Sequence, residues 1–195
     1  MAIINYMQNY TTKPIYVYGG YLRNLINGED ENDVDVYFDQ PHSLHKWRRH
    51  LLKIEKHLKL KYKVESGAHG HFAKLEKQLK LKSVTYGLPL TYCMQECIDV
   101  QDPAEYAGLK IRINGILFDF HTQINGSIKF TDTCDYTCNN LYLDGNLLKA
   151  RITADVSSIV HHIQRKQLIP VNSTINMAYR TEKMTKYGYR MTSEK

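Results

Sequence analysis

The fold is decided by Ile15-Tyr16-Val17-Tyr18-Gly19-Gly20-Tyr21-Leu22-Arg23-Asn24-Leu25-Ile26-Asn27-Gly28, followed by Asp33-Val34-Asp35-Val36-Tyr37-Phe38. The first four residues are alternately placed β-branched and aromatic side chains, which predicts a short buried strand. Gly19-Gly20 ends that strand, and apolar side chains at 22, 25 and 26 then share one face of a short helix. Gly28 ends the helix. The stretch therefore predicts a strand, a glycine turn, a helix and a second strand.

Two carboxylates begin the second strand. Side chains alternate across a strand, so Asp33 and Asp35 lie on one side and the two valines on the other. Neighbouring carboxylates repel unless a cation neutralises them, and Mg²⁺ or Mn²⁺ prefers carboxylate and phosphate oxygens. A third carboxylate on a nearby strand would let two metal ions bind about 4 Å apart. We predict Asp33, Asp35 and Asp119 as metal ligands and catalytic residues.

The glycine turn has the features of a phosphate site. Gly19 and Gly20 open a helix at the end of a strand, where backbone N–H groups can approach phosphate without an intervening side chain. Arg23 follows one turn later on the same helix face as Gly20 and can add a charge-assisted contact. These three residues predict binding of a triphosphate.

Composition restricts the class of protein. The chain has 195 residues, of which 43% are hydrophobic and 24% charged, and its net charge is +6. This is the composition of a globular protein with one domain, or one domain and an appendage. No run of about 18 apolar residues occurs, and residues 1–10 lack a basic segment followed by an apolar one. We predict a cytoplasmic protein with no membrane partner.

The other elements complete an α+β pattern with a mixed central sheet flanked by helices. Asn114-Gly115 is the strongest hairpin signal and joins strands predicted at 109–113 and 116–121. A second hairpin turn is predicted at 143–147. The remaining predicted elements are a long amphipathic helix at 43–60, a strand at 61–65, a turn at 67–71 and helices at 72–82, 153–168 and 174–187.

Positive charge is concentrated in one segment. Residues 46–82 contain twelve Lys/Arg and three Glu, whereas the rest of the chain contains 14 basic and 17 acidic residues. Such a regional field is expected of a surface that meets nucleic acid, although a solvated helix face gives the same pattern. We predict RNA binding by basic residues of the long helix, namely Lys46, Arg48, Arg49, Lys53 and Lys56.

The cysteines and histidines favour ordinary structural roles. The pairs Cys93/Cys97 and Cys134/Cys138 have a three-residue gap, wider than that of most zinc sites, which favours buried reduced thiols over zinc. His69 and His71 are more typical of an exposed loop than of a metal site.

At this point the sequence resembles a known family. Tyr18 to Gly28, followed by Asn32 to Val36, looks like the head-domain signature of the tRNA CCA-adding enzymes and bacterial poly(A) polymerases. These enzymes belong to the DNA polymerase β-like nucleotidyltransferase superfamily. Residues 135–141, Asp-Tyr-Thr-Cys-Asn-Asn-Leu, resemble the family's element that helps hold the incoming nucleotide, and residues 180–189 resemble its C-terminal helix.

The resemblance implies a minimal nucleotidyltransferase fold, with a catalytic domain at 1–150 and a helical, neck-like extension at 151–195 packed on it. The implied activity moves an NMP from an NTP to a hydroxyl, most simply that of an RNA 3′ end, with release of pyrophosphate. Magnesium or manganese is the implied cofactor. The implied nucleotide-binding residues are Gly19, Gly20, Arg23, Asp135, Asn139, Arg180 and Lys183.

The chain also departs from the family pattern. Asn24 occupies a position that is usually Asp, and Thr133 and Cys134 replace the expected arginines. The element that reads the incoming base aligns with 173–177, where Ser173, Thr174 and Met177 supply neither the acid nor the arginine. These departures imply changed base selection.

Three further hypotheses stay open on the sequence. One is a catalytically decayed module of the same fold that binds nucleotide or RNA. Another is transfer of the nucleotide to a protein or small-molecule hydroxyl. The third is an interaction protein that uses residues 42–63 as a partner or membrane-surface helix.

Overall fold

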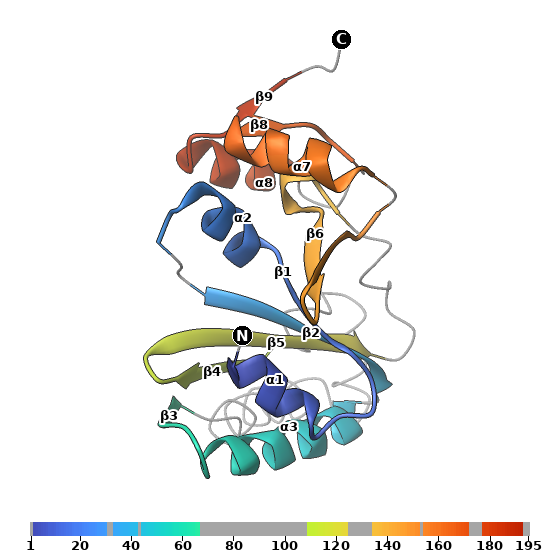
Figure 1. Cartoon of the computed structure of the whole chain (residues 1–195), viewed down its shortest axis with the longest axis vertical. Coiled ribbons are helices and arrows are strands. Elements are labelled where there is room, and N and C mark those ends of the chain that lie inside the picture. The colour runs from blue at the N-terminus through green and yellow to red at the C-terminus, as the bar shows by residue number, and fades with distance from the viewer. Residues whose placement is uncertain are drawn as a thin grey trace, which may run out of the picture. The chain divides into compact units, whose positions relative to one another are not determined.

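The computed structural model describes residues 2–30, 33–42, 44–66, 109–124, 134–152, 154–171 and 177–192 (Figure 1). The chain forms two compact units. Unit 1 comprises Met1–Pro14 and Val36–Ser127, and unit 2 comprises Ile15–Asp35 and Ile128–Lys195. The domain boundary expected near residue 150 is a different division of the chain and stays a prediction.

Strands of unit 1 follow the order β3-β4-β5-β2. Their bounds are Val64–Ser66 for β3, Leu109–Ile113 for β4, Ile116–Ile124 for β5 and Asp33–His42 for β2, whose first three residues belong to unit 2. β4 and β5 are antiparallel. Asn114 and Gly115 join them with φ angles of 50° and 82°, the left-handed pair that a two-residue hairpin turn requires. The predicted hairpin is confirmed.

The helices among the described residues of unit 1 are α1 (Ala2–Gln8) and α3 (Leu44–Leu58). α3 confirms the predicted long helix, whereas α1 was not predicted. The Tyr6 hydroxyl of α1 donates to the His57 carbonyl of α3 over 3.2 Å. The buried apolar side chains of this unit come from both helices and from the sheet, and they include Met7, Leu51, Ile54, Leu58, Ile111 and Phe120.

In unit 2 the strand order is β2-β1-β6-β7. β1 spans Ile15–Tyr18, β6 spans Leu141–Asp144 and β7 spans Leu147–Ala150, with β6 antiparallel to both neighbours. These strands confirm the predicted first strand and the second hairpin. Tyr18 at the end of β1 lies opposite Tyr142.

The described residues of unit 2 include four helical segments. They are α2 (Gly20–Asn27), the 3₁₀ turn η2 (Thr137–Asn139), α7 (Val156–Gln164) and α8 (Met177–Lys186). Gly28 ends α2 as predicted, with a φ of 64° and a backbone N–H that donates to the Leu25 carbonyl. α2 packs against β1 and α7, and α7 packs against η2.

Several predicted bounds were wrong. The helix expected to reach residue 168 ends at Gln164, because Lys166 takes a left-handed φ of 53° and residues 167–168 form β8 (Gln167–Leu168). β8 pairs in parallel with β9 (Arg190–Met191). The strand expected at 61–65 begins at Val64, because the Tyr62 N–H still donates to Leu58 at the end of α3. The turn and helix predicted at 67–82 lie outside the described residues.

The fold class is confirmed. The pairs β1–β6, β3–β4, β4–β5 and β6–β7 are antiparallel, β8–β9 is parallel, and together with the helices these strands make an α+β protein. The sequence order of strand, glycine turn, helix and acidic strand appears as β1, Gly19, α2 and β2.

Candidate nucleotide and metal site

The glycine turn lies against the acidic strand within unit 2. Gly19 caps α2 with a φ of 71°, and a Cβ placed on it would lie 2.6 Å from Asp35 Oδ2. Any side chain at Gly19 would therefore collide with the carboxylate as well as strain the backbone. The structure thus brings two of the predicted site residues, Gly19 and Asp35, into direct contact through local folding of β1, α2 and β2.

Arg23 turns inward from α2. It is 7% exposed, and its Nη1 donates to Asn139 Oδ1 over 2.6 Å. Its guanidinium lies 5.6 Å from the ring centres of Tyr187 and of Tyr189. Its Nη2 would be 3.3 Å from a Cβ on Gly20, so the guanidinium lies directly beneath the first turn of α2. Arg23 therefore joins the glycine turn, η2 and the C-terminal segment of unit 2.

Asp135 is the centre of a second set of contacts in unit 2. Its Oδ1 accepts from the Tyr136 N–H over 2.8 Å and from Asn139 Nδ2 over 2.9 Å. Its Oδ2 forms an ion pair of 2.6 Å with Arg180 Nε. Because Asn139 also accepts from Arg23, these contacts link four of the predicted nucleotide-binding residues in one network. Lys183 is exposed on α8.

Charge controls the ionisation of Asp135. Burial raises the pKa of Asp135. The Arg180 charge and the hydrogen bonds from Asn139 and Tyr136 together lower it by more, so the net pKa is below its ordinary value. The pKa of Arg180 is raised, because its attraction to Asp135 outweighs the effect of burial. Asp135 is therefore an anion throughout the neutral range, and its charge is compensated within the network.

Asp119 lies on β5 in unit 1, opposite Lys110 in the β4–β5 ladder. Its Oδ2 is 3.0 Å from Lys110 Nζ, and its Oδ1 is 3.2 Å from His121 Nε2. Burial raises the pKa of Asp119. His121 and Lys110 together lower it by more, so the net pKa is below its ordinary value. His121 was missed in the sequence, although its place two residues after Asp119 predicts the same face of a strand.

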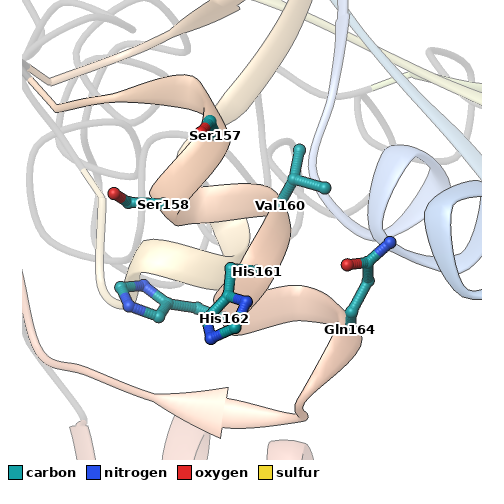
Figure 2. Close-up of a pocket in the computed structure, with 6 residues that line it drawn as sticks. All are labelled: Ser157, Ser158, Val160, His161, His162 and Gln164. Atoms are coloured by element: carbon teal, nitrogen blue, oxygen red, sulfur yellow. The ribbon is translucent and has the colours of Figure 1, made fainter.

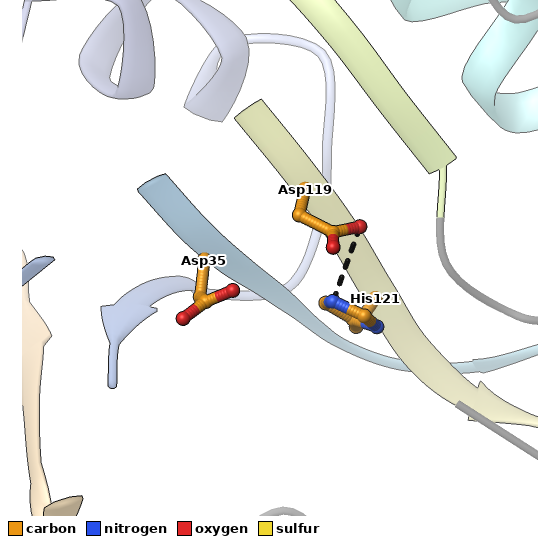
Figure 3. Close-up of side chains that lie close together, drawn as sticks. All are labelled: Asp35, Asp119 and His121. Carbon is orange, nitrogen blue, oxygen red and sulfur yellow. Dashed lines mark ion pairs between the residues drawn. The ribbon is translucent and has the colours of Figure 1, made fainter. Parts of the chain in front are cut away.

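Three side chains offer a set of metal-binding atoms. One ligand atom from each of Asp35, Asp119 and His121 lies within 4.8 Å of the others. Figure 3 shows Asp35 on β2 and the ion pair between Asp119 and His121 on β5. Asp33 does not belong to this group of three, although it starts the same strand and is partly buried. Two oxygen donors suit Mg²⁺ or Mn²⁺, and the imidazole nitrogen suits a transition ion better than Mg²⁺.

The basic face of α3 belongs to unit 1. Lys46, Arg49, Lys53 and Lys56 are exposed, and their spacing of three, four and three residues places them on one side of the helix. We call these four residues the basic stripe. The side chain of Arg48, predicted with them, lies outside the described set.

Arg151 is a residue that sequence reasoning missed. It follows β7 and is partly buried, with its guanidinium 5.2 Å from the centre of the Tyr18 ring. Burial lowers its pKa, against an opposing effect of Cys134, Tyr18, Asp135 and Asp35. No motif marks it, because its neighbours on unit 2 come from other segments of the chain.

The described cysteines are buried thiols. Cys134 and Cys138 are free, 3% and 1% exposed, and burial raises the pKa of each to about 12. They are therefore protonated at neutral pH and are not metal ligands in that state. Cys93, Cys97, His69 and His71 lie outside the described residues.

A surface hollow on α7 lacks the chemistry of a phosphate site. It is lined by Ser157, Ser158, Val160, His161, His162 and Gln164 (Figure 2). The two histidine rings are 6.4 Å apart at a steep angle, and His162 Nδ1 is 3.1 Å from Thr137 Oγ1. No acidic or permanently cationic side chain lines it. Of the described parts of the chain, the glycine turn and its neighbours remain the better candidate.

Comparison with solved structures shows the fold. A CCA-adding enzyme in its apo form I aligns with a TM-score of 0.52 and 12% identity, over 98% of this chain and 38% of that one. A Thermotoga maritima CCA-adding enzyme complexed with tRNA gives 0.52 and 13%, over 98% and 38%. A tRNA nucleotidyltransferase complexed with a primer tRNA and an incoming ATP analogue gives 0.53 and 12%, over 97% and 46%.

These likenesses confirm the predicted nucleotidyltransferase fold. The chain spans less than half the length of these enzymes. No family model matches the sequence, and no curated protein matches it. Among the described helices, none has the length and apolar character needed to cross a bilayer.

Proposed function

We propose that this protein is a metal-dependent nucleotidyltransferase. An acceptor hydroxyl attacks the α-phosphorus of an NTP, the bond to the β-phosphate oxygen breaks, and pyrophosphate leaves with that electron pair. The observation that carries the proposal is the contact of Gly19 with Asp35, at 2.6 Å for a Cβ on that glycine. A backbone turn suited to phosphate beside a carboxylate suited to a cation supports the proposal.

The predicted residues then have distinct roles. Gly19 and Gly20 offer N–H groups to the phosphates, and Asp35, Asp119 and His121 hold the cation, with Asp33 beside them. Bound there, Mg²⁺ or Mn²⁺ would neutralise phosphate charge and lower the pKa of the acceptor hydroxyl. Asp119 assists removal of the hydroxyl proton, since its lowered pKa keeps it ionised.

The hydrogen-bond network around Asp135 positions the proposed nucleotide-binding residues of unit 2. Arg23, Asn139, Asp135 and Arg180 connect α2, η2 and α8 through hydrogen bonds of 2.6–2.9 Å. Two of these links join residues more than 40 positions apart in the chain, so the network holds distant segments of unit 2 together, which supports a nucleotide-binding role for these residues. We infer that Lys183, exposed on α8, reaches the nucleotide from the same helix as Arg180.

We further propose RNA as the acceptor. The basic stripe presents four cations on one face of α3, a surface that neutralises phosphates without reading sequence. Two of the structural neighbours are solved as complexes with tRNA. An RNA 3′ hydroxyl accounts for both observations better than a protein or small-molecule hydroxyl, which gives the basic stripe no role in the reaction.

The test is direct. Purified protein is incubated with each α-labelled NTP, Mg²⁺ or Mn²⁺, and total RNA, and the label is followed into RNA, protein, small molecules or water. We expect label at RNA 3′ ends from the wild type and none from the double variant Asp33→Ala, Asp35→Ala with its fold retained. Label on protein would replace the proposed acceptor. No label in any fraction, or undiminished label in the double variant, would contradict the proposal.

A further inference from the structure

Three tyrosines and a histidine from two distant segments of unit 1 form one cluster of rings. Tyr10, which follows α1, stacks its ring on that of His57 in α3, with ring centres 3.9 Å apart and an angle of 15°. Tyr6 of α1 meets the Tyr10 ring edge-on at 5.3 Å and the Tyr62 ring at 5.6 Å. All four side chains are half-buried. We call Tyr6, Tyr10, His57 and Tyr62 the aromatic cluster.

Hydrogen bonds hold these rings in place. The Tyr10 hydroxyl donates to the Tyr6 hydroxyl over 3.1 Å, and the Tyr6 hydroxyl donates to the His57 carbonyl over 3.2 Å. The backbone N–H of Tyr62 donates to the Leu58 carbonyl over 2.8 Å. Because the rings are ordered in the protein by itself, a ligand that stacks on them loses little affinity to ordering their side chains.

Lys61 adds a positive charge to the aromatic cluster. Its Nζ lies 5.0 Å from the centre of the Tyr6 ring and 5.8 Å from that of the Tyr62 ring. Lys59, two residues earlier, is paired with Glu55 at 2.5 Å. Lys61 is exposed, and among the described residues no carboxylate forms an ion pair with it. Its charge can therefore attract an anion that approaches the rings.

The aromatic cluster adjoins the basic stripe on α3. Lys53 of the stripe precedes His57 by four positions, and residues four positions apart are neighbours on the surface of a helix. Unit 1 thus offers cations and aromatic rings side by side. Phosphates alternating with flat, unpaired bases are the chemistry of a single strand of nucleic acid, which matches both parts of this surface.

We propose that the aromatic cluster stacks on unpaired bases of single-stranded RNA, while Lys61 and the basic stripe bind the adjoining phosphates. Stacking tolerates any sequence, because every base presents a π face. Bases in a duplex are stacked on one another, so the surface should prefer a single strand to a duplex. The inference rests on the proposed function for its choice of RNA, and it deepens that function by naming an unpaired strand as what unit 1 binds.

The experiment compares the double variant Tyr10→Leu, Tyr62→Leu with Tyr10→Phe, Tyr62→Phe in the full-length protein. Leucine removes the rings, whereas phenylalanine keeps them and removes only the hydroxyls. Binding of single-stranded RNA, duplex RNA and inorganic polyphosphate is measured by titration at several salt concentrations. We expect the leucine variant to lose about 10- to 100-fold in affinity for single-stranded RNA. Its polyphosphate affinity and its slope of log K against log salt should be unchanged, because no phosphate contact is lost.

Two controls separate stacking from other effects. The phenylalanine variant should keep the affinity of the wild type for RNA. Tyr179→Leu, which removes a tyrosine that is 57% exposed on α8 of unit 2, should keep it as well. Equal losses in Tyr179→Leu and in the leucine double variant would overturn the inference. A parallel loss of polyphosphate affinity, or equal affinity of the wild type for single-stranded and duplex RNA, would also overturn it.

Cross-linking of the wild type decides the question if the leucine variant does not fold. RNA that carries 4-thiouridine is irradiated in complex with the protein, and the cross-linked peptides are identified. We expect cross-links at the aromatic cluster, and cross-links confined to other segments would overturn the inference. Failure of the proposed function gives a different result. RNA affinity that depends on the rings, without label transfer to RNA, would contradict the nucleotidyltransferase and support the stacking surface. Label transfer to RNA with no dependence on the rings would do the reverse.

Discussion

The two units differ in how far their charged side chains are buried and paired. In unit 2, Asp135 is 6% exposed, Arg23 is 7% exposed, and both are engaged by Asn139. In unit 1, the four cations of the basic stripe stand in solvent on α3. Buried and paired charge fixes geometry at a high desolvation cost, whereas exposed charge attracts a polyanion over several ångströms and contributes little to stability.

Asp119 is an exception within unit 1. It is 8% exposed, yet its partner Lys110 is 57% exposed and its other contact is the titratable His121. Asp135 accepts two hydrogen bonds from its own turn in addition to its ion pair. This difference in partners indicates that Asp135 stabilises the fold, whereas Asp119 can exchange Lys110 and His121 for a cation.

The largest expected effect concerns Asp119. Asp119→Asn retains the shape of the side chain and removes its charge, so we expect transfer to fall by at least about 100-fold. The thermal midpoint should change little, because a pair with an exposed lysine contributes little to stability. Label transfer and thermal unfolding are measured on the same protein sample.

Asp144→Asn is the matched control for Asp119→Asn. Asp144 also pairs with a lysine across a ladder, with Lys149 at 2.6 Å between β6 and β7, and it lies outside the predicted site residues. Its transfer rate should match the wild type. Equal losses in the two variants, or full activity in Asp119→Asn, would remove the distinction between Asp119 and other paired carboxylates.

Asp135 should instead affect stability. Asp135→Ala removes the acceptor of two hydrogen bonds and leaves Arg180 without its partner, so we expect a loss of about 2–3 kcal/mol in the free energy of unfolding. Urea denaturation measures this loss. Asp155→Ala, which removes an exposed cap of α7, is the control and should cost less. If the two variants are equally stable, the buried network is not a structural one.

The same network predicts how stability depends on acidity. The folded-state pKa of Asp135 is lowered, so its contribution is present above the unfolded pKa of about 3.9 and is lost as pH falls through the folded value. Asp119 has the same sign. Stability measured in urea from pH 7 to pH 3 should decline on the acid side. The decline should be shallower in Asp135→Asn than in wild type, and identical slopes would contradict the assignment.

The sequence predicts most of the elements because their signals are local. Each signal depends on residues within a few positions of one another. The signals are the alternation of side chains in β1, the left-handed backbone of the Asn114-Gly115 turn and the apolar spacing of α3. The acidic pair and the glycine turn are close in sequence as well. Their contact at Gly19 and Asp35 follows from one strand-turn-helix-strand unit.

What the sequence does not predict depends on distant residues. Arg23 turns toward Asn139, which is 116 positions away, rather than simply outward from the helix face it shares with Gly20. Arg151 meets Tyr18 only because β1, β6 and β7 pair in that order. Packing between segments that are distant in the sequence determines these contacts, and no local pattern in a single sequence predicts them. His121 differs, because its alternation with Asp119 was readable in the sequence.

The smallest expected effect tests the exposed side of the comparison. Arg49→Gln, Lys53→Gln and Lys56→Gln together remove three charges of the basic stripe. If the stripe binds RNA, affinity for single-stranded RNA should fall about equally for different sequences. The slope of log K against log salt should also become shallower by about 2, since each lost phosphate contact releases about 0.7 fewer counterions. Binding is measured by titration at several salt concentrations.

A matched triple variant separates location from total charge. Arg165→Gln, Lys186→Gln and Arg190→Gln remove the same number of exposed cations from unit 2. If net charge alone attracts RNA, both triple variants should weaken binding to the same extent, and the stripe has no special role. If α3 is the binding face, only the first variant changes the salt slope. Both variants should keep the affinity for ATP, because none of the six substituted residues is among the proposed nucleotide-binding residues. Loss of ATP affinity in the α3 variant would show that the exposed and buried charges do not act separately.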